Sequence, residues 1–142
     1  MIFDKYYKNK NEREEEIEMT KSLDSSDSDE YFTSLFRFQS QLKIMHWGTT
    51  SYAGHQAYGL TYDTIDKLLD NLVESYQGIY GNLTFSQCGF IEFKDVDVDK
   101  WLNDIMDSIN SFRNELKEDE LKNQLDEIGS SVSKLKYLLT LK

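Results

Sequence analysis

The sequence predicts an all-α fold, a bundle of four amphipathic helices with a long connection between the second and the third. Three observations predict it. The 142 residues include no proline, the residue that most strongly interrupts helices. Apolar residues recur at alternating spacings of four and three over four separate stretches, the period of one helix face. A chain of this length can also bury roughly two thirds of its unfolded surface in a single core.

The first 29 residues are expected to form an acidic, flexible arm outside the bundle. They contain a block of glutamates over Glu12–Glu18 and a Ser/Asp-rich stretch over Ser22–Asp29. So few apolar residues cannot offset the entropy lost on ordering the chain. A single helix over the glutamate block is the alternative. The bundle itself is expected over residues 30–142.

The first bundle helix is predicted from Glu30 to Trp47, with Asp27 or Asp29 as its N-cap. Gly48 is expected to end it in a left-handed conformation. The buried stripe consists of Tyr31, Leu35, Phe38, Leu42 and Met45.

The second helix is predicted from about Ala53 to Tyr80, and Gly78, Gly81 and Asn82 supply the stop signal. The link between the two helices is short, so they should be antiparallel neighbours. The apolar stripe of the second helix comprises Tyr58, Tyr62, Ile65, Leu69, Leu72 and Tyr76, and His55 continues it one turn earlier.

Residues 83–96 read as a mostly irregular connection, with a small β element over Phe90–Phe93 as the alternative. Asp97 or Asp99 is expected to cap the third helix, which runs to about Lys117. The fourth helix opens with Glu118, Asp119 and Glu120, whose negative charges favour a helix N-terminus. The two buried stripes are Trp101, Ile105, Ile109, Phe112 and Leu116, then Leu121, Leu125, Ile128, Val132, Leu135 and Leu139.

Composition excludes several classes of function. A net charge of −10 and a pI near 4.6 repel phosphate backbones, so no nucleic-acid partner is expected. The single cysteine, Cys88, excludes an intramolecular disulfide and any cysteine-cluster metal site. No membrane span or signal-peptide core is visible. We therefore expect a soluble protein of the cytoplasm, or of the host's cytoplasm if the chain is viral.

Both histidines and a row of carboxylates fall on the first two helices. Asp66, Asp70 and Glu74 are spaced four apart and therefore share one helix face, with Asp63 one turn earlier on the same side. Together with His46 and His55, they are ligands of the kind that suit Fe(II), Mn(II) or Zn(II). A structural reading is also open, in which the histidines cap or pack helix ends and the acidic stripe is a solvated face.

The segment Leu42–Glu74 resembles the Dps proteins, the miniferritins of the ferritin-like superfamily. Their pattern is a His-Trp pair closing one helix, a second histidine opening the next, and an Asp and a Glu four apart farther along. His46-Trp47, His55, Asp70 and Glu74 match it. The resemblance implies a ferritin-like four-helix bundle with a long crossover between helices two and three. It also implies a homo-oligomer of twelve subunits built from dimers, in which Fe(II) is bound, oxidised and stored.

In that family the two histidines come from one subunit and the Asp and Glu from its twofold partner, with the tryptophan beside the iron. The resemblance thus assigns His46, His55, Asp70 and Glu74 as metal ligands and Trp47 as a neighbour of the metal.

The sequence departs from the family in two places. Gly59 stands where a carboxylate is usual, and the loop between the histidines is about three residues shorter. Asp63 or Asp66 could supply the missing carboxylate. These departures favour a second hypothesis, a non-catalytic ferritin-like assembly protein of the kind that phages encode, with a degenerate metal site and Trp47 packing the rim of the bundle.

Overall fold

Four long helices account for most of the computed structural model, which describes residues 26–85 and 89–141. The helices are α2 (Ser26–Gly48), α3 (Tyr52–Tyr80), α4 (Val98–Glu115) and α5 (Asp119–Leu138), and a short 3₁₀ helix, η1 (Phe93–Asp95), precedes α4. Across these residues no strand is formed, so the all-α prediction is confirmed. The β element considered at residues 90–93 is absent, because residues 93–95 form the 3₁₀ turn instead.

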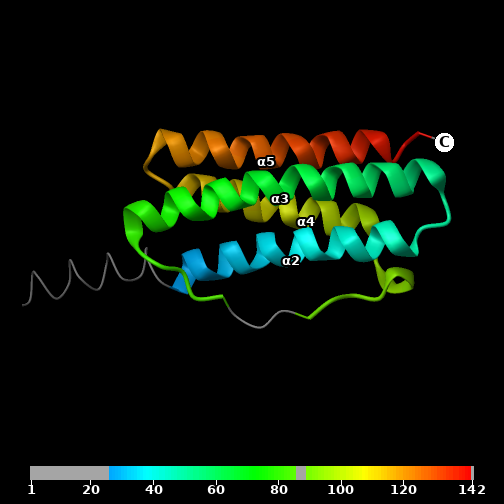
Figure 1. The fold of residues 1–142 in the computed structure, drawn as a ribbon, viewed down its shortest axis with the longest axis horizontal. Helices are drawn as coiled ribbons and strands as arrows, with labels where there is room; N and C mark the ends of the chain where they lie inside the picture. The colour runs from blue at the N-terminus through cyan, green and yellow to red at the C-terminus, as the bar shows by residue number, and fades with distance from the viewer. Residues whose placement is uncertain (1–25, 86–88, 142) are drawn as a thin grey trace, which may run out of the picture.

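The helices lie side by side (Figure 1). α2 packs against α3 and α4, and α5 packs against the same two helices from the opposite side. Each helix therefore has two neighbours, and the four apolar stripes meet in a common centre. The part of the chain that the structure describes includes no helix with the length and apolar character needed to span a membrane.

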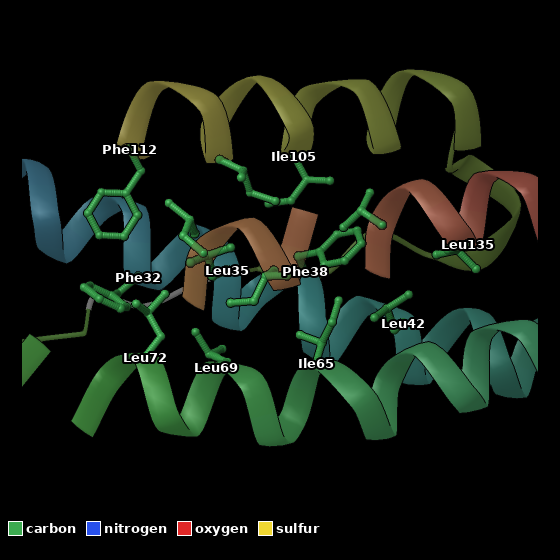
Figure 2. Packing of buried hydrophobic residues seen from close by; sticks show 14 of the residues in the cluster. Phe32, Leu35, Phe38, Leu42, Ile65, Leu69, Leu72, Ile105, Phe112 and Leu135 are labelled. Carbon is green, nitrogen blue, oxygen red and sulfur yellow. The ribbon is translucent and has the colours of Figure 1, made fainter. Parts of the chain in front are cut away.

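The core consists largely of the predicted stripes (Figure 2), and Phe32 and Leu102 also belong to it. Four residues predicted in the stripes are only partly buried and pack against the core: Tyr31, Tyr62, Trp101 and Leu139. At one end it is aromatic: the ring of Phe112 from α4 stacks on Tyr31 at 4.8 Å between centroids and meets Phe32 edge-on at 5.1 Å. Tyr76 from α3 approaches Phe32 at 4.9 Å. Three helices are thereby joined by one aromatic cluster. Elsewhere the core is mostly aliphatic, with Phe38 and Tyr58 as its buried aromatic residues. The fully buried aliphatic residues are Leu42, Ile65, Leu72, Leu121, Leu125, Ile128, Val132 and Leu135.

The described parts of the connection between α3 and α4 lie beside α2 (Figure 1). The Thr84 N–H donates to the Asp29 carboxylate at 3.0 Å, and the Phe85 ring contacts Phe36. Farther along, the side-chain amide of Gln41 donates to the carbonyl of Ile91 at 2.9 Å and accepts from the N–H of Ile91 at 3.0 Å. The described parts of the connection are thus attached to α2 by hydrogen bonds to the backbone.

The start of α2 differs from the prediction. The helix begins at Ser26, so residues 26–29, which were expected in the arm, are helical, and Asp27 and Asp29 lie in its first turn instead of capping it. The reason is tertiary, because Ser28 is buried and its hydroxyl accepts a 2.6 Å hydrogen bond from Tyr76. The rest of the expected arm, residues 1–25, lies outside the described residues.

The predicted left-handed end at Gly48 is also wrong. Among the described residues only Gly81 has a positive φ, at 93°. Gly48 is instead required for close packing, since a Cβ at this position would lie 2.5 Å from the Phe93 ring. At the start of α4 the prediction holds, because Asp97, one of its two candidate caps, accepts from the Lys100 N–H. Ser51, which was not predicted as a cap, caps α3 by accepting from the Gly54 N–H.

Stability at alkaline pH is expected to depend on Tyr58. Burial raises the pKa of this phenol above its usual 10.0, so the unfolded chain loses the proton at a lower pH than the folded chain. The free energy of unfolding should therefore be constant for this group below pH 10 and fall above it. Tyr58→Phe should reduce the loss of unfolding free energy measured by urea denaturation between pH 9 and pH 11. Tyr52→Phe, at a residue that is 77% exposed, is the control and should change nothing.

Candidate functional site

His46 and His55 meet where α2 ends and α3 begins. Their rings are stacked, with 3.8 Å between centroids and 22° between planes. His46 Nδ1 lies 2.7 Å from the carbonyl oxygen of His55, and His55 Nδ1 lies 2.9 Å from the carbonyl oxygen of His46. The sequence predicted that both histidines belong to one site, and the structure brings them into contact.

These reciprocal hydrogen bonds define which nitrogen of each ring carries a proton. A carbonyl oxygen only accepts, so each Nδ1 must donate. In the neutral rings both Nε2 atoms then keep a lone pair, which is the form in which imidazole binds a metal. A backbone carbonyl on the far nitrogen is also the usual second-shell partner of a metal-binding histidine. Each ring is thus oriented, with Nε2 available.

Gly59, one turn after His55, makes this arrangement possible. A Cβ at Gly59 would lie 2.9 Å from both Cε1 and Nδ1 of His46. The imidazole therefore occupies the space that a side chain at position 59 would need. The Dps resemblance implies a carboxylate at position 59. Such a side chain would clash with the His46 ring in its observed position.

The acidic residues of α3 lie away from the histidines. From His55 to Asp70 is fifteen residues of helix, a rise of about 22 Å at ~1.5 Å per residue. Consistently, no group of three or more His, Cys, Asp or Glu side chains that could hold a metal forms within residues 26–85 and 89–141. A single chain therefore brings the two histidines together but does not add Asp70 or Glu74 to them.

The four carboxylates differ in their contacts. Asp66 accepts a 2.7 Å hydrogen bond from the side-chain amide of Gln39 on α2. Asp63, Asp70 and Glu74 are exposed, and no partner for them is found in the described part of the chain. Neither Asp63 nor Asp66 replaces the missing carboxylate at Gly59 within one chain, since neither joins the histidines in a ligand group.

Trp47 is 70% exposed on the outer surface of α2. The Lys43 ammonium lies 5.8 Å from the Trp47 ring centroid and 4.6 Å from that of Tyr62 on α3. Both contacts are within the range of cation–π attraction. The expectation that Trp47 packs the bundle rim is therefore not what the structure shows, because most of the indole faces solvent.

A groove on the surface of α2 and α3 was not predicted from the sequence. It has a volume of about 390 Å³ and lies between α2, α3 and Phe85. Its apolar lining comprises Phe36, Leu69, Val73 and Phe85, and its polar lining comprises Gln39, Asp66, Lys67 and Asp70. One sign of this groove was present in the sequence, because Phe36 widens the apolar face of α2 beyond the core stripe. Phe85 is distant in the sequence and reaches Phe36 only in the folded chain.

The sequence model of a family described as a family of unknown function, DUF5856, matches residues 46–139. This segment starts at His46 and includes His55, Gly59 and the acidic residues of α3. The chain is also 29% identical over 116 residues to an uncharacterized 14.6 kDa protein from the mobD-ri intergenic region of Enterobacteria phage T4. That alignment covers 82% of this chain and 90% of the phage protein. No solved structure matches the chain significantly.

Proposed function

Because the chain belongs to the DUF5856 family, whose function is not known, we propose a function from its own side chains: a ferritin-like protein that binds and oxidises Fe(II) at sites shared between two copies of the chain. His46 and His55 of one copy and Asp70 and Glu74 of the other supply the ligands. The single observation that carries the proposal is that both Nδ1 atoms are hydrogen-bonded to carbonyl oxygens. The lone pairs of both Nε2 atoms are therefore the ones that would bind a metal ion.

The donor set fits the ion. Two imidazole nitrogens and two carboxylates match the preferences of Fe(II), and also those of Mn(II) and Zn(II). The carboxylates that have no partner within the described chain would find one across the interface. Gly59 leaves the site with fewer carboxylates than the Dps resemblance implies, so weak binding of a single ion at each site is the expected outcome.

The arrangement of the helices supports the same proposal. The long connection along α2 allows α3 and α4 to run in the same direction (Figure 1), which is the feature that ferritin-like bundles obtain with one crossover. The proposed assembly is a dimer, with a dodecamer as the larger form that the resemblance implies. The similarity to a phage protein supports action in the cytoplasm of a host cell.

A second candidate function is favoured by the same hydrogen bonds. The histidines satisfy carbonyls at the junction of α2 and α3, and the His46 ring fills the space at Gly59. Those roles require no metal, so the chain would then be a non-catalytic assembly protein that kept the bundle.

Variants of both histidines to asparagine separate the two functions. An asparagine amide can still donate from nearly the position of Nδ1, but it has no Nε2. In the proposed site, His46→Asn and His55→Asn should keep the helical fold, as circular dichroism would show, while lowering the affinity for Zn(II), measured by calorimetry, by about tenfold or more. Aerobic Fe(II) oxidation should be faster than in buffer for the parent and should fall to the buffer rate in His55→Asn and Asp70→Asn.

Asp107→Asn is the control for the carboxylate, because Asp107 is an exposed residue of α4 far in sequence from the histidines. It should leave both measurements unchanged. Binding heats and oxidation rates that are equal to those of buffer for the parent chain would exclude the metal function and leave the assembly function.

A further inference from the structure

A pocket separate from the groove at Phe36 and Phe85 lies between α2, η1 and α4. Its volume is about 320 Å³, within the range of roughly 300–1,000 Å³ that is usual for pockets binding small organic molecules. Neither histidine and none of the four carboxylates of α3 lines it. A ligand in this pocket would therefore be bound independently of the proposed metal site.

The inner walls of the pocket are apolar. Phe38 of α2 and Ile105 of α4 are only 2% and 6% exposed, and the Trp101 ring lies against Phe38 with 4.9 Å between centroids. Ile91 and Val96 of the connection complete the apolar lining. These walls fit a large apolar group, and an aromatic one best, because aromatic rings prefer offset or edge-to-face contacts with one another.

The wall that the connection contributes is held in place by the chain itself. The Gln41 side chain binds both backbone groups of Ile91, at 2.9 and 3.0 Å, and Asp97 caps the start of α4. Gln41 also lines the pocket, but its amide is used for this attachment. The pocket is thus formed before any ligand binds, as is usual for small-molecule sites.

Five charged side chains line the pocket: Arg37, Asp95, Asp97, Lys100 and Asp104. Three of them are already engaged, since the Lys100 ammonium lies 2.7 Å from the Asp104 carboxylate and Asp97 accepts from the backbone N–H of Lys100 at 3.1 Å. Arg37 and Asp95 are exposed, and neither forms an ion pair with another described residue. One guanidinium and one carboxylate therefore remain for a ligand.

We propose that this pocket binds a free amino acid with a large apolar side chain. Arg37 binds its carboxylate through two parallel N–H···O bonds, the geometry that a guanidinium favours, and Asp95 accepts from its ammonium group. The apolar side chain lies against Phe38 and Trp101. The three carboxylates of the lining and the net charge of −10 disfavour a simple anion, and Arg37 disfavours a simple cation. A zwitterion satisfies both remaining charges.

The test is an NMR titration of the ¹⁵N-labelled full chain with L-phenylalanine, in EDTA so that no metal contributes. The chain has two tryptophans, and of these only Trp101 lines the pocket. Its indole N–H signal should shift in a saturable manner, while the signal of Trp47 should stay in place. The variant Trp47→Phe assigns the two signals.

Two analogues with the same ring test the two charges. 3-Phenylpropionate lacks the ammonium group, and phenethylamine lacks the carboxylate. Each should bind about tenfold more weakly than L-phenylalanine or weaker still, because each loses the hydrogen bonds of one charged group.

Two variants assign the charges to residues. Arg37→Gln should weaken the binding of L-phenylalanine by about tenfold or more without weakening that of phenethylamine. Asp95→Asn should do the same without weakening that of 3-phenylpropionate. The controls Lys134→Gln and Asp107→Asn remove like charges from exposed positions of α5 and α4 outside the lining, and they should leave all three affinities unchanged. Circular dichroism checks that every variant keeps its helices.

A Trp101 signal that does not shift in a saturable manner with L-phenylalanine would overturn the proposal. It would also be overturned by an analogue that binds as tightly as L-phenylalanine, which would indicate a site for a simple carboxylate or a simple amine. Variants that weaken all three ligands alike would show that Arg37 and Asp95 do not bind the two charged groups, and would overturn it too. The selective pattern in EDTA would support it whether or not the chain binds Fe(II).

Discussion

Phe112→Ala is expected to lower the free energy of unfolding by about 3–5 kcal/mol, the range for removal of a large aromatic side chain from a core. Phe112 is 2% exposed, and its ring contacts Tyr31, Phe32 and Tyr76. The substitution would therefore open a cavity where α2, α3 and α4 meet. Small domains are stable by about 5–15 kcal/mol, so much of the stability should be lost, as urea denaturation would show.

Phe90→Ala provides the control for this loss. Phe90 lies in the connection between α3 and α4 and is 53% exposed, so its removal should change the unfolding free energy by no more than about 0.5 kcal/mol. A loss below about 1 kcal/mol for Phe112→Ala would show that the aromatic cluster does not hold these helices together.

The second large effect is a contrast between two glycines of α3. Alanine is favoured over glycine inside a helix by about 1 kcal/mol, so Gly78→Ala, where a Cβ would meet nothing within 4 Å, should stabilise the chain by roughly 0.5–1 kcal/mol. Gly59→Ala should instead destabilise it. Its Cβ would lie 2.9 Å from the His46 ring and would force that ring out of the stack.

The cost of overpacking is about 1–3 kcal/mol, which exceeds the gain in helix propensity. The two alanine variants should therefore differ by about 2 kcal/mol in unfolding free energy, with opposite signs relative to the parent. Chemical denaturation of the three proteins measures this. Equal stabilisation at both positions would mean that the His46 ring moves freely and that the stacked pair contributes nothing to stability.

Most of the fold was predictable because the helices are strongly periodic. The stripes from Leu121 to Leu135 and from Ile105 to Phe112 are buried as predicted, and Asp97, one of the two candidate caps, caps α4. The errors lie at helix ends. Local sequence could not predict the early start of α2 or the role of Gly48, because each depends on a residue from a distant segment. Tyr76 binds Ser28 in the first turn of α2, and Phe93 packs against Gly48 at its end.

The candidate site was predictable only in part. Residue types and spacing identified the histidines, but the backbone hydrogen bonds that orient the rings depend on how α2 meets α3. Gly59 was noticed as a missing carboxylate, whereas in the structure it is the space for His46. The groove at Phe36 and Phe85 was missed because its two sides are 49 residues apart in the chain.

The pairing of Gln41 with Ile91 has a consequence for how related chains can vary. The Gln41 amide both donates to and accepts from the backbone of residue 91, so these hydrogen bonds do not depend on which side chain residue 91 has. Evolution is then constrained at only one of the two positions. Position 91 can therefore vary among many residue types. Gln41 itself is 2% exposed, and a Glu in its place would lose the donor and leave the Ile91 carbonyl without this hydrogen bond. Among related chains, an amide retained at position 41 beside a freely varying position 91 would be the expected trace of this attachment.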